Sequence, residues 1–307
     1  MSIMSSMSEE SSVRILVVSA VAGSGKTRRV VLKLIDILCH GGEAVVAVHA
    51  NSVRREITGR ILNWAKGLGY QVEHNGSVLK WTDTEWVEVA TTPSRGSGSH
   101  DYIGVVGFPG LVHVASLDGL VHMALSRMGQ VTPEGRIVIG ENTVNGTNYI
   151  GKRLLMHRLL TEDPLNVSLA VDAIFPLSTE DSGPHRRIGL FLDEFQDTDD
   201  DMVQVTKLLA SEVASRGAGN LTMVVGDPRQ NVFGEAERSM MDFCEQMARE
   251  SEPGWFHLDE MSICHRCPQG HLALVNHLYP IELGHQRMAH PMEGVQTTED
   301  NKLACQS

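Results

Sequence analysis

The chain has 307 residues, of which 42% are hydrophobic and 21% charged, an ordinary balance for a folded globular protein. Its formal net charge of −12 argues against a protein that coats nucleic acid through bulk positive charge, although a local basic groove remains compatible with that charge. No apolar run approaches the roughly 20 residues of a membrane-spanning helix, so we expect a soluble protein without a membrane partner. Five cysteines in a chain without a recognisable signal peptide fit a reducing compartment, so we expect an intracellular (cytoplasmic) location.

The N-terminal part of the chain contains a candidate phosphate-binding loop. Residues 1–12 are polar, Ser-rich and acidic, and we expect them to form a disordered lead. An apolar run at 15–18 then precedes the sequence AVAGSGKT at 20–27, and a helical pattern follows it. Strand, glycine-bearing turn and helix is the order that a phosphate-binding loop requires.

The residue types in this loop suit the binding of a nucleotide phosphate. Gly23 and Gly25 let backbone N–H groups approach phosphate oxygens without a Cβ in the way. The following helix N-terminus and Lys26 both supply positive charge, and Thr27 supplies a hydroxyl ligand for Mg²⁺. Ala20 stands where the strict pattern has glycine.

Short β-branched runs alternate with helical patterns along the chain. The predicted strands are residues 14–18, 44–48, 111–115, 188–192 and 221–225. This alternation predicts an α/β fold with a mostly parallel sheet and helices on both faces. In such sheets, ligands bind beyond the carboxyl ends of the strands.

Two segments interrupt this alternation and are predicted to be insertions. Residues 67–110 are rich in Gly, Ser, Thr and Trp, with strand-like alternation at 77–82 and 85–90, so they indicate a small β-rich unit.

The second predicted insertion, residues 128–187, combines a possible hairpin with a helix near 151–160. Its Asp163-Pro164 step is typical of a turn. Residues 281–307 lack periodicity, and we expect a tail or the remnant of another domain there.

Three groups of basic residues are candidates for a nucleic-acid groove. They are Arg54, Arg55 and Arg60; Lys152, Arg153 and Arg158; and Arg186 and Arg187. For the second and third groups we favour the simpler interpretation of a solvated charged face.

The sequence LFLDEFQDT at 190–198 is the most informative segment. Three apolar residues end a predicted buried strand, and Asp193 and Glu194 follow where that strand would meet solvent. Acids at this position can hold Mg²⁺ and orient an attacking water. An acidic helix start, favoured by the helix dipole, is the alternative for this pair on its own.

A third polar strand end follows residues 221–225. Gly226 and Asp227 come directly after that strand, and Gln230 follows three residues later. The amide of Gln230 is suited to detect a γ-phosphate through a hydrogen bond.

Together these motifs resemble superfamily 1 helicases of the UvrD/PcrA/Rep type. AGSGKT at 22–27 is similar to their motif I, LDEFQDT at 192–198 to motif II and VVGDPRQNVF at 224–233 to motif III. Softer similarities are HANSVRREI at 49–57 to motif Ia, VASLDGL at 114–120 to motif Ib and CHRC at 264–267 to motif IV.

The resemblance implies a P-loop NTPase with a RecA-like domain at residues 13–280, and an ATP hydrolase that requires Mg²⁺. The implied nucleotide-binding residues are Ala22, Gly23, Ser24, Gly25, Lys26, Thr27, Asp193, Gln230 and Arg266. Thr27 and Asp193 would hold the metal, while Glu194 would activate water. Lys26, Gln230 and Arg266 would complete the catalytic set.

The resemblance also implies contact with single-stranded nucleic acid; DNA is the usual substrate of this family, and the sequence itself does not separate DNA from RNA. The implied contact residues are His49, Asn51, Ser116 and Phe233. No segment resembles motifs V and VI, so we expect the second RecA-like domain to be absent or truncated. A partner protein could then supply the second motor lobe.

Three alternatives remain open. The chain could be a catalytically weak, nucleotide-dependent scaffold or binding protein derived from a helicase, or a P-loop kinase. Separately, the spacing of Cys264, Cys267, His271 and His277 is tolerable for zinc, although the two histidines fall on different faces of a predicted helix.

Overall fold

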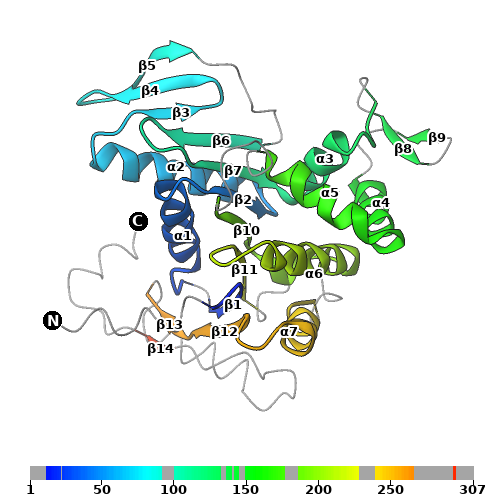
Figure 1. Ribbon diagram of the computed structural model, residues 1–307. Helices are drawn as coiled ribbons and strands as arrows, with labels where there is room; N and C mark the ends of the chain where they lie inside the picture. Colours follow the sequence, from blue (N-terminus) through cyan, green and yellow to red (C-terminus); the bar gives the residue numbers. More distant parts are fainter. Residues whose placement is uncertain are drawn as a thin grey trace.

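The computed structural model describes residues 12–21, 23–91, 100–132, 136–139, 142–144, 149–176, 186–227, 239–265 and 293–294. Its centre is a ten-stranded sheet with the strand order β12-β1-β11-β10-β2-β7-β6-β3-β4-β5 (Figure 1). Helices cover this sheet on both faces, so the chain has an α/β fold built on a large mixed sheet.

Six neighbouring strands of the sheet are parallel. They are β12 (Phe256–Met261), β1 (Ile15–Ala20), β11 (Leu221–Gly226), β10 (Ile188–Leu192), β2 (Glu43–Val48) and β7 (Leu111–Ser116). Five of them confirm the predicted strands to within two residues at either end. Every residue of β1, β2 and β10 is buried, as expected for parallel strands covered on both faces.

The other four strands extend the same sheet in antiparallel fashion. They are β6 (His100–Val105), β3 (Val72–His74), β4 (Ser77–Trp81) and β5 (Trp86–Thr91). The strands predicted at 77–82 and 85–90 are confirmed as β4 and β5. They continue the main sheet through β3 and β6, however, so the sheet is mixed on this side.

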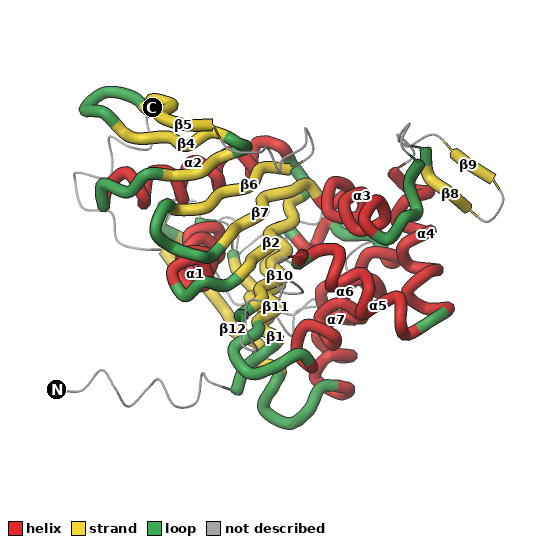
Figure 2. The backbone as a smooth tube through the Cα atoms, turned by 45° about the horizontal axis from the view of Figure 1, so that its top comes forward, coloured by secondary structure: helices red, strands yellow, loops and turns green. Residues whose placement is uncertain are grey.

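One face of the sheet is covered by α1 (Lys26–Cys39) and α2 (Asn51–Gly67). Leu34 of α1 and Ile61 of α2 are fully buried in a core shared with Val46 of β2 and Val114 of β7. Figure 2 shows these two helices on the opposite side of the strands from the remaining helices.

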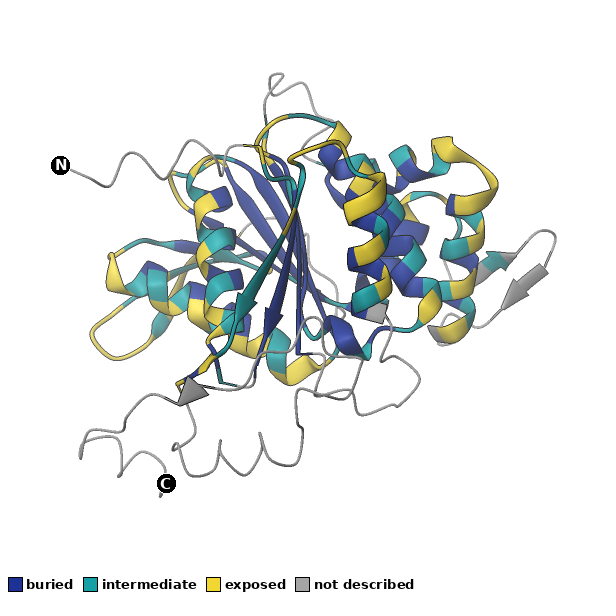
Figure 3. Cartoon of the chain, turned by 90° about the horizontal axis from the view of Figure 1, so that it is seen from below, coloured by how far each residue is buried: buried dark blue, intermediate teal, exposed yellow. Residues whose placement is uncertain are grey.

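The opposite face carries a thicker helical layer. Its helices are α3 (Leu117–Arg127), α4 (Tyr149–Glu162), α5 (Pro164–Ile174), α6 (Asp200–Ser215) and α7 (Ser239–Glu250). The central parallel strands, β1, β10 and β2 among them, therefore lie buried between two helical layers (Figure 3). The helix predicted near 151–160 is confirmed as α4, which packs against α3 and α6.

Two short strand pairs lie outside the main sheet. The predicted hairpin corresponds to β8 (Ile137–Ile139) and β9 (Asn142–Val144), which pair in antiparallel fashion. The strands β13 (Ile263–Cys264) and β14 (Glu293–Gly294) pair in parallel. Among the residues that the structure describes, no helix is long and apolar enough to cross a membrane.

Candidate active site

The loop after β1 turns sharply into α1. Gly25 caps this helix with φ at +91°, a left-handed conformation that favours glycine, and Gly23 has φ at +73°. Lys26 and Thr27 are the first residues of α1. Ser24 is buried, and its Oγ has no hydrogen-bond partner within the described part of the chain. Ala22 lies outside the described residues.

The C-terminal part of the described chain holds this loop in place. The backbone N–H of Val21 donates to the carbonyl of Met261, at 3.0 Å, and the N–H of His265 donates to the carbonyl of Gly23, at 3.0 Å. These contacts arise because β12 pairs with β1 and therefore ends beside the loop.

The acidic segment follows β10 in a constrained conformation. The Asp193 N–H donates to the carbonyl of Ala47 at 3.0 Å, which continues the pairing with β2. Glu194 has φ at +57°, in the left-handed region, and leads into a short 3₁₀ helix, η2 (Phe195–Asp197). Such a backbone persists only where its surroundings hold it. Phe195 supplies that support, because it is fully buried and contacts Phe243 edge-on, with ring centroids 5.3 Å apart.

The loop and the acidic segment meet at the carboxyl ends of the strands. Lys26 Nζ lies 2.6 Å from Glu194 Oε2, and the Thr27 hydroxyl donates to Asp193 Oδ2 at 3.4 Å. The Lys26 and Glu194 side chains are only 11% and 25% exposed. Four predicted site residues, separated by more than 160 positions in the sequence, therefore form one cluster.

Gln196 connects this cluster to β11. Its Nε2 donates to Glu194 Oε2 at 2.9 Å, and its Oε1 accepts from the backbone N–H of Asp227 at 3.0 Å. Gly226 permits this approach, because a Cβ there would lie 2.7 Å from Gln196 Oε1. No role for Gln196 was predicted from the sequence. Its position two residues after Glu194 was the only available signal.

The two carboxylates of the site have pKa values shifted in opposite directions. Burial, and secondly the charge of Glu194, raise the pKa of Asp193 to about 6. Burial alone would also raise the pKa of Glu194, but the Lys26 charge and the hydrogen bonds from Gln196 and Lys26 lower it below its ordinary value. Glu194 is therefore the more firmly ionised member of the pair.

We expect Asp193→Asn to stabilise the metal-free protein at neutral pH. The pKa of Asp193 is higher in the folded state than in the unfolded state. The free energy of unfolding therefore falls as the pH rises from about 4 to about 6, and this loss is complete at pH 7. Removing the buried charge should add about 3 kcal/mol to the free energy of unfolding at pH 7, but only about 0.5 kcal/mol at pH 4. Denaturant unfolding at both pH values, in EDTA, measures this difference.

The matched control for this prediction is Asp36→Asn, since the Asp36 side chain is 51% exposed. It should change the free energy of unfolding little at either pH. An Asp193→Asn protein that is less stable than the wild type at pH 7 would contradict the electrostatic account of this site.

The three predicted nucleic-acid residues that the structure describes, His49, Asn51 and Ser116, lie close to the same edge of the sheet, but they differ in their contacts. His49 follows β2, and its Nε2 lies 3.0 Å from the Thr198 hydroxyl; burial, as the largest cause, lowers its pKa. Ser116 ends β7 and caps α3 by accepting from the Gly119 N–H at 3.0 Å. Asn51 is exposed at the start of α2. The His49 ring is thus engaged with the acidic segment.

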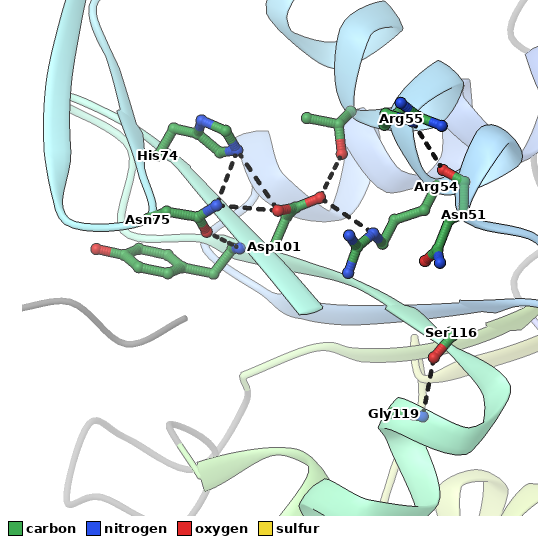
Figure 4. A network of polar contacts seen from close by, with 10 residues as sticks. Asn51, Arg54, Arg55, His74, Asn75, Asp101, Ser116 and Gly119 are labelled. Carbon is green, nitrogen blue, oxygen red and sulfur yellow. Dashed lines mark hydrogen bonds and ion pairs between the residues drawn. The ribbon is translucent and has the colours of Figure 1, made fainter. Parts of the chain in front are cut away.

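Figure 4 shows the polar network around the start of α2. Asp101 of β6 lies at its centre: Oδ1 accepts from Asn75 Nδ2 at 2.9 Å, and Oδ2 lies 3.6 Å from Arg54 Nε. Arg54 is therefore paired with a carboxylate, whereas Arg55 is exposed and donates to the carbonyl of Asn51 at 3.4 Å. Of these two arginines, Arg55 has the more accessible charge.

We predicted that the basic groups at residues 152–158 and 186–187 form solvated charged faces. This prediction is wrong for three of their residues. Lys152 is 5% exposed, and Arg153 contacts both Asp118 and Asp199. Arg186 donates to two backbone carbonyls, those of Gly41 and Pro109. These residues are structural because the helix and loop that carry them pack against the body of the protein. For Arg158, which is exposed, the interpretation is confirmed.

Several predicted positions lie outside the described residues. They are Ala22, Gln230, Phe233 and Arg266, and for the zinc alternative Cys267, His271 and His277. The last described residue before Arg266 is His265, which contacts the loop through Gly23 as given above.

Comparison of this sequence with protein-family models and with curated proteins finds no match. The function of the site is therefore inferred from its own residues and their arrangement.

Proposed function

We propose that this chain is a helicase-type NTPase of the UvrD-like superfamily 1 kind, which hydrolyses ATP with Mg²⁺ and couples hydrolysis to the binding of single-stranded nucleic acid. In this proposal the fold is a RecA-like P-loop domain. One observation carries it: Lys26 and Thr27, at the start of a helix behind a glycine turn, contact Glu194 and Asp193 at the end of a buried parallel strand.

The order of the strands supports this proposal. The strand β11 lies between β1 and β10, and all three are parallel, so the loops that follow them open at one edge of the sheet. Ligands of parallel α/β sheets bind beyond the carboxyl ends of their strands. The phosphate loop, the two acids and Asp227 all lie at that edge.

The residues present fit a magnesium ion. A threonine hydroxyl and a carboxylate are the hard oxygen ligands that Mg²⁺ prefers, and the oxygens of Thr27 and Asp193 already lie 3.4 Å apart. The raised pKa of Asp193 marks a buried carboxylate whose charge the protein compensates only in part. When bound, Mg²⁺ would neutralise charge on the β- and γ-phosphate oxygens.

Different residues of the chain would then bind the phosphates and activate the water. The ammonium of Lys26 and the N-terminus of α1 would hold the phosphates. Because Lys26 is now paired with Glu194, phosphate binding would draw Lys26 away and leave the Glu194 carboxylate able to accept a proton from water. The contact of His265 with the loop favours a role for the adjacent Arg266 in stabilising transferred phosphate charge.

The nucleic-acid part of the proposal depends on two neighbouring strands. Asn51 and Ser116 follow β2 and β7, which pair in parallel, so both residues lie near one edge of the sheet, as does the accessible charge of Arg55. Because motifs V and VI are not recognised in this sequence, we propose hydrolysis rather than autonomous unwinding. Translocation would need a second lobe, supplied by a partner protein or by a longer parent polypeptide.

The proposal is tested by phosphate release from ATP by the purified protein, with Mg²⁺ or EDTA, and with single-stranded DNA, single-stranded RNA or neither. We expect hydrolysis that needs Mg²⁺ and that increases with DNA. Binding of ATP without hydrolysis under any condition would instead favour the scaffold alternative. A protein that does not bind ATP at all would contradict the proposal.

A further inference from the structure

One arginine outside the candidate nucleotide site connects two of its neighbouring segments. Arg153 belongs to α4, in the segment predicted as the second insertion. Its Nε donates to Asp118 Oδ1 at 2.7 Å, and its Nη1 donates to Asp199 Oδ2. The Arg153 and Asp118 side chains are only 20% and 26% exposed, so solvent screens this contact less than a surface ion pair, whereas the Asp199 side chain is 43% exposed.

The Asp199 side of this connection leads to the catalytic acids. Asp199 lies five residues after Glu194 and caps α6 by accepting from the Met202 N–H at 2.9 Å. The residues between Glu194 and Asp199 are held in turn. Gln196 contacts Glu194, and Thr198 contacts His49. A displacement of Asp199 would therefore shift the position of Glu194, because the short segment between them is held by these contacts.

The Asp118 side leads to the predicted nucleic-acid edge. Asp118 lies in the first turn of α3, two residues after Ser116, the residue that caps this helix. The Arg153 side chain thus connects the segment that carries Glu194 to the junction of β7 and α3, where Ser116 lies.

A second contact keeps α4 against the start of α6. His157, one helical turn after Arg153, has its Nδ1 2.7 Å from Asp201 Oδ1. The guanidinium of Arg153 can bond two carboxylates at once because its N–H groups form a rigid, planar fork, which a lysine ammonium does not. Arg153 can therefore hold the carboxylates of Asp118 and Asp199 at a fixed distance from each other.

We infer that Arg153 is a positioning residue, which holds Asp199 against Asp118 and so fixes the Glu194 segment relative to Ser116 at the junction of β7 and α3. The inference rests on the proposed function and deepens it, because it names the contact through which a strand bound beside Ser116 increases hydrolysis at Glu194. Arg153 itself touches neither nucleotide nor the reacting atoms.

The test is Arg153→Gln, studied by steady-state ATP hydrolysis with and without single-stranded DNA. We expect the DNA-stimulated kcat to fall about tenfold, since small misplacements of catalytic groups have effects of this order or larger. The KM for ATP should stay within about twofold, because the phosphate loop does not contact Arg153. The ratio of stimulated to basal rate should approach one.

Two further variants separate positioning from a general structural effect. Arg153→Lys keeps the charge but loses the fork, so we expect partial restoration of the stimulated rate. Arg158→Gln, on the same helix, removes an ion pair with Glu162 at a side chain that is 64% exposed, and it should leave both rates unchanged. Equal losses of rate in Arg153→Gln and Arg158→Gln would overturn the inference.

A double-mutant cycle locates the partner through which Arg153 acts. Asp199→Asn keeps a side chain that can cap α6 but removes the charge that Arg153 bonds. If the two residues act together, Arg153→Gln/Asp199→Asn should lose no more rate than the more impaired single variant. Fully additive losses would overturn the connection through Asp199.

The outcomes distinguish this inference from the proposed function. If the wild type hydrolyses ATP and Arg153→Gln retains its full DNA-stimulated rate, only the inference fails. If the wild type hydrolyses no ATP, the proposed function fails, and the inference fails with it.

Discussion

Glu194→Gln should lower the kcat of ATP hydrolysis by about 10²–10⁴-fold while nucleotide still binds. Glutamine has nearly the same shape as glutamate, so it can still accept a hydrogen bond from Lys26 and from Gln196. It cannot take a proton from water. Single-turnover phosphate release, together with ATP affinity from calorimetry, separates the loss of chemistry from any loss of binding.

The matched control is Glu162→Gln, which removes an acid from an exposed ion pair in α4, with its side chain 55% exposed. It should hydrolyse ATP at the wild-type rate. A Glu194→Gln protein that retains wild-type kcat would remove Glu194 from the catalytic role assigned to it.

Lys26→Ala should weaken the binding of ATP by about 100-fold, the effect expected for losing charge-assisted hydrogen bonds of about 1.5–3 kcal/mol. The loss has a second cause, because the two acids that face the phosphates would then have no cation beside them. The pairing of Lys26 Nζ with Glu194 Oε2 shows how close that cation lies. Titration with a fluorescent ATP analogue measures the change.

Lys33→Ala removes the same charge from the same helix, about two turns away from the loop, and should bind ATP normally. If both lysine variants bound ATP equally well, the loop at residues 23–27 would not be the phosphate site. Both lysine variants should bind adenosine, which has no phosphates, as tightly as the wild type does.

The parallel half of the sheet could be predicted from the sequence because its strands are buried on both faces. Strands such as Ile15–Ala20 and Glu43–Val48 are nearly continuous apolar runs, and polar residues follow the end of each strand. Edge strands lack this signature. The strand Phe256–Met261 mixes apolar with polar and charged residues, is only partly buried and was not predicted.

The antiparallel side and the added helices were harder to predict for local reasons. The strand Val72–His74 has three residues, too few for a periodic pattern, and its place is decided by pairing with β6 and β4. The Asp163-Pro164 step, expected to be a turn, begins α5: Asp163 caps the helix by accepting from the Leu165 N–H, and Pro164 is its first residue.

The candidate site was predictable where each segment carries its own chemistry. Lys26, Thr27, Asp193 and Glu194 stand in motifs whose strand–loop–helix context could be identified from sequence, and the structure brings them together. The contacts between segments could not be predicted in this way. Neither Arg153 nor Gln196 has a local pattern that indicates which distant residue it contacts, because those contacts are created by the packing of α4 and β11.

The pairing of β12 with β1 determines how truncation of the chain before residue 256 would affect the sheet. Loss of Phe256–Met261 would turn β1, which is fully buried, into the outer strand of the sheet. Its unpaired backbone groups and its valine-rich sequence would then offer a template for pairing with other chains. We expect chains that end before residue 256 to aggregate, even though every segment of the proposed nucleotide site up to β11 would still be present.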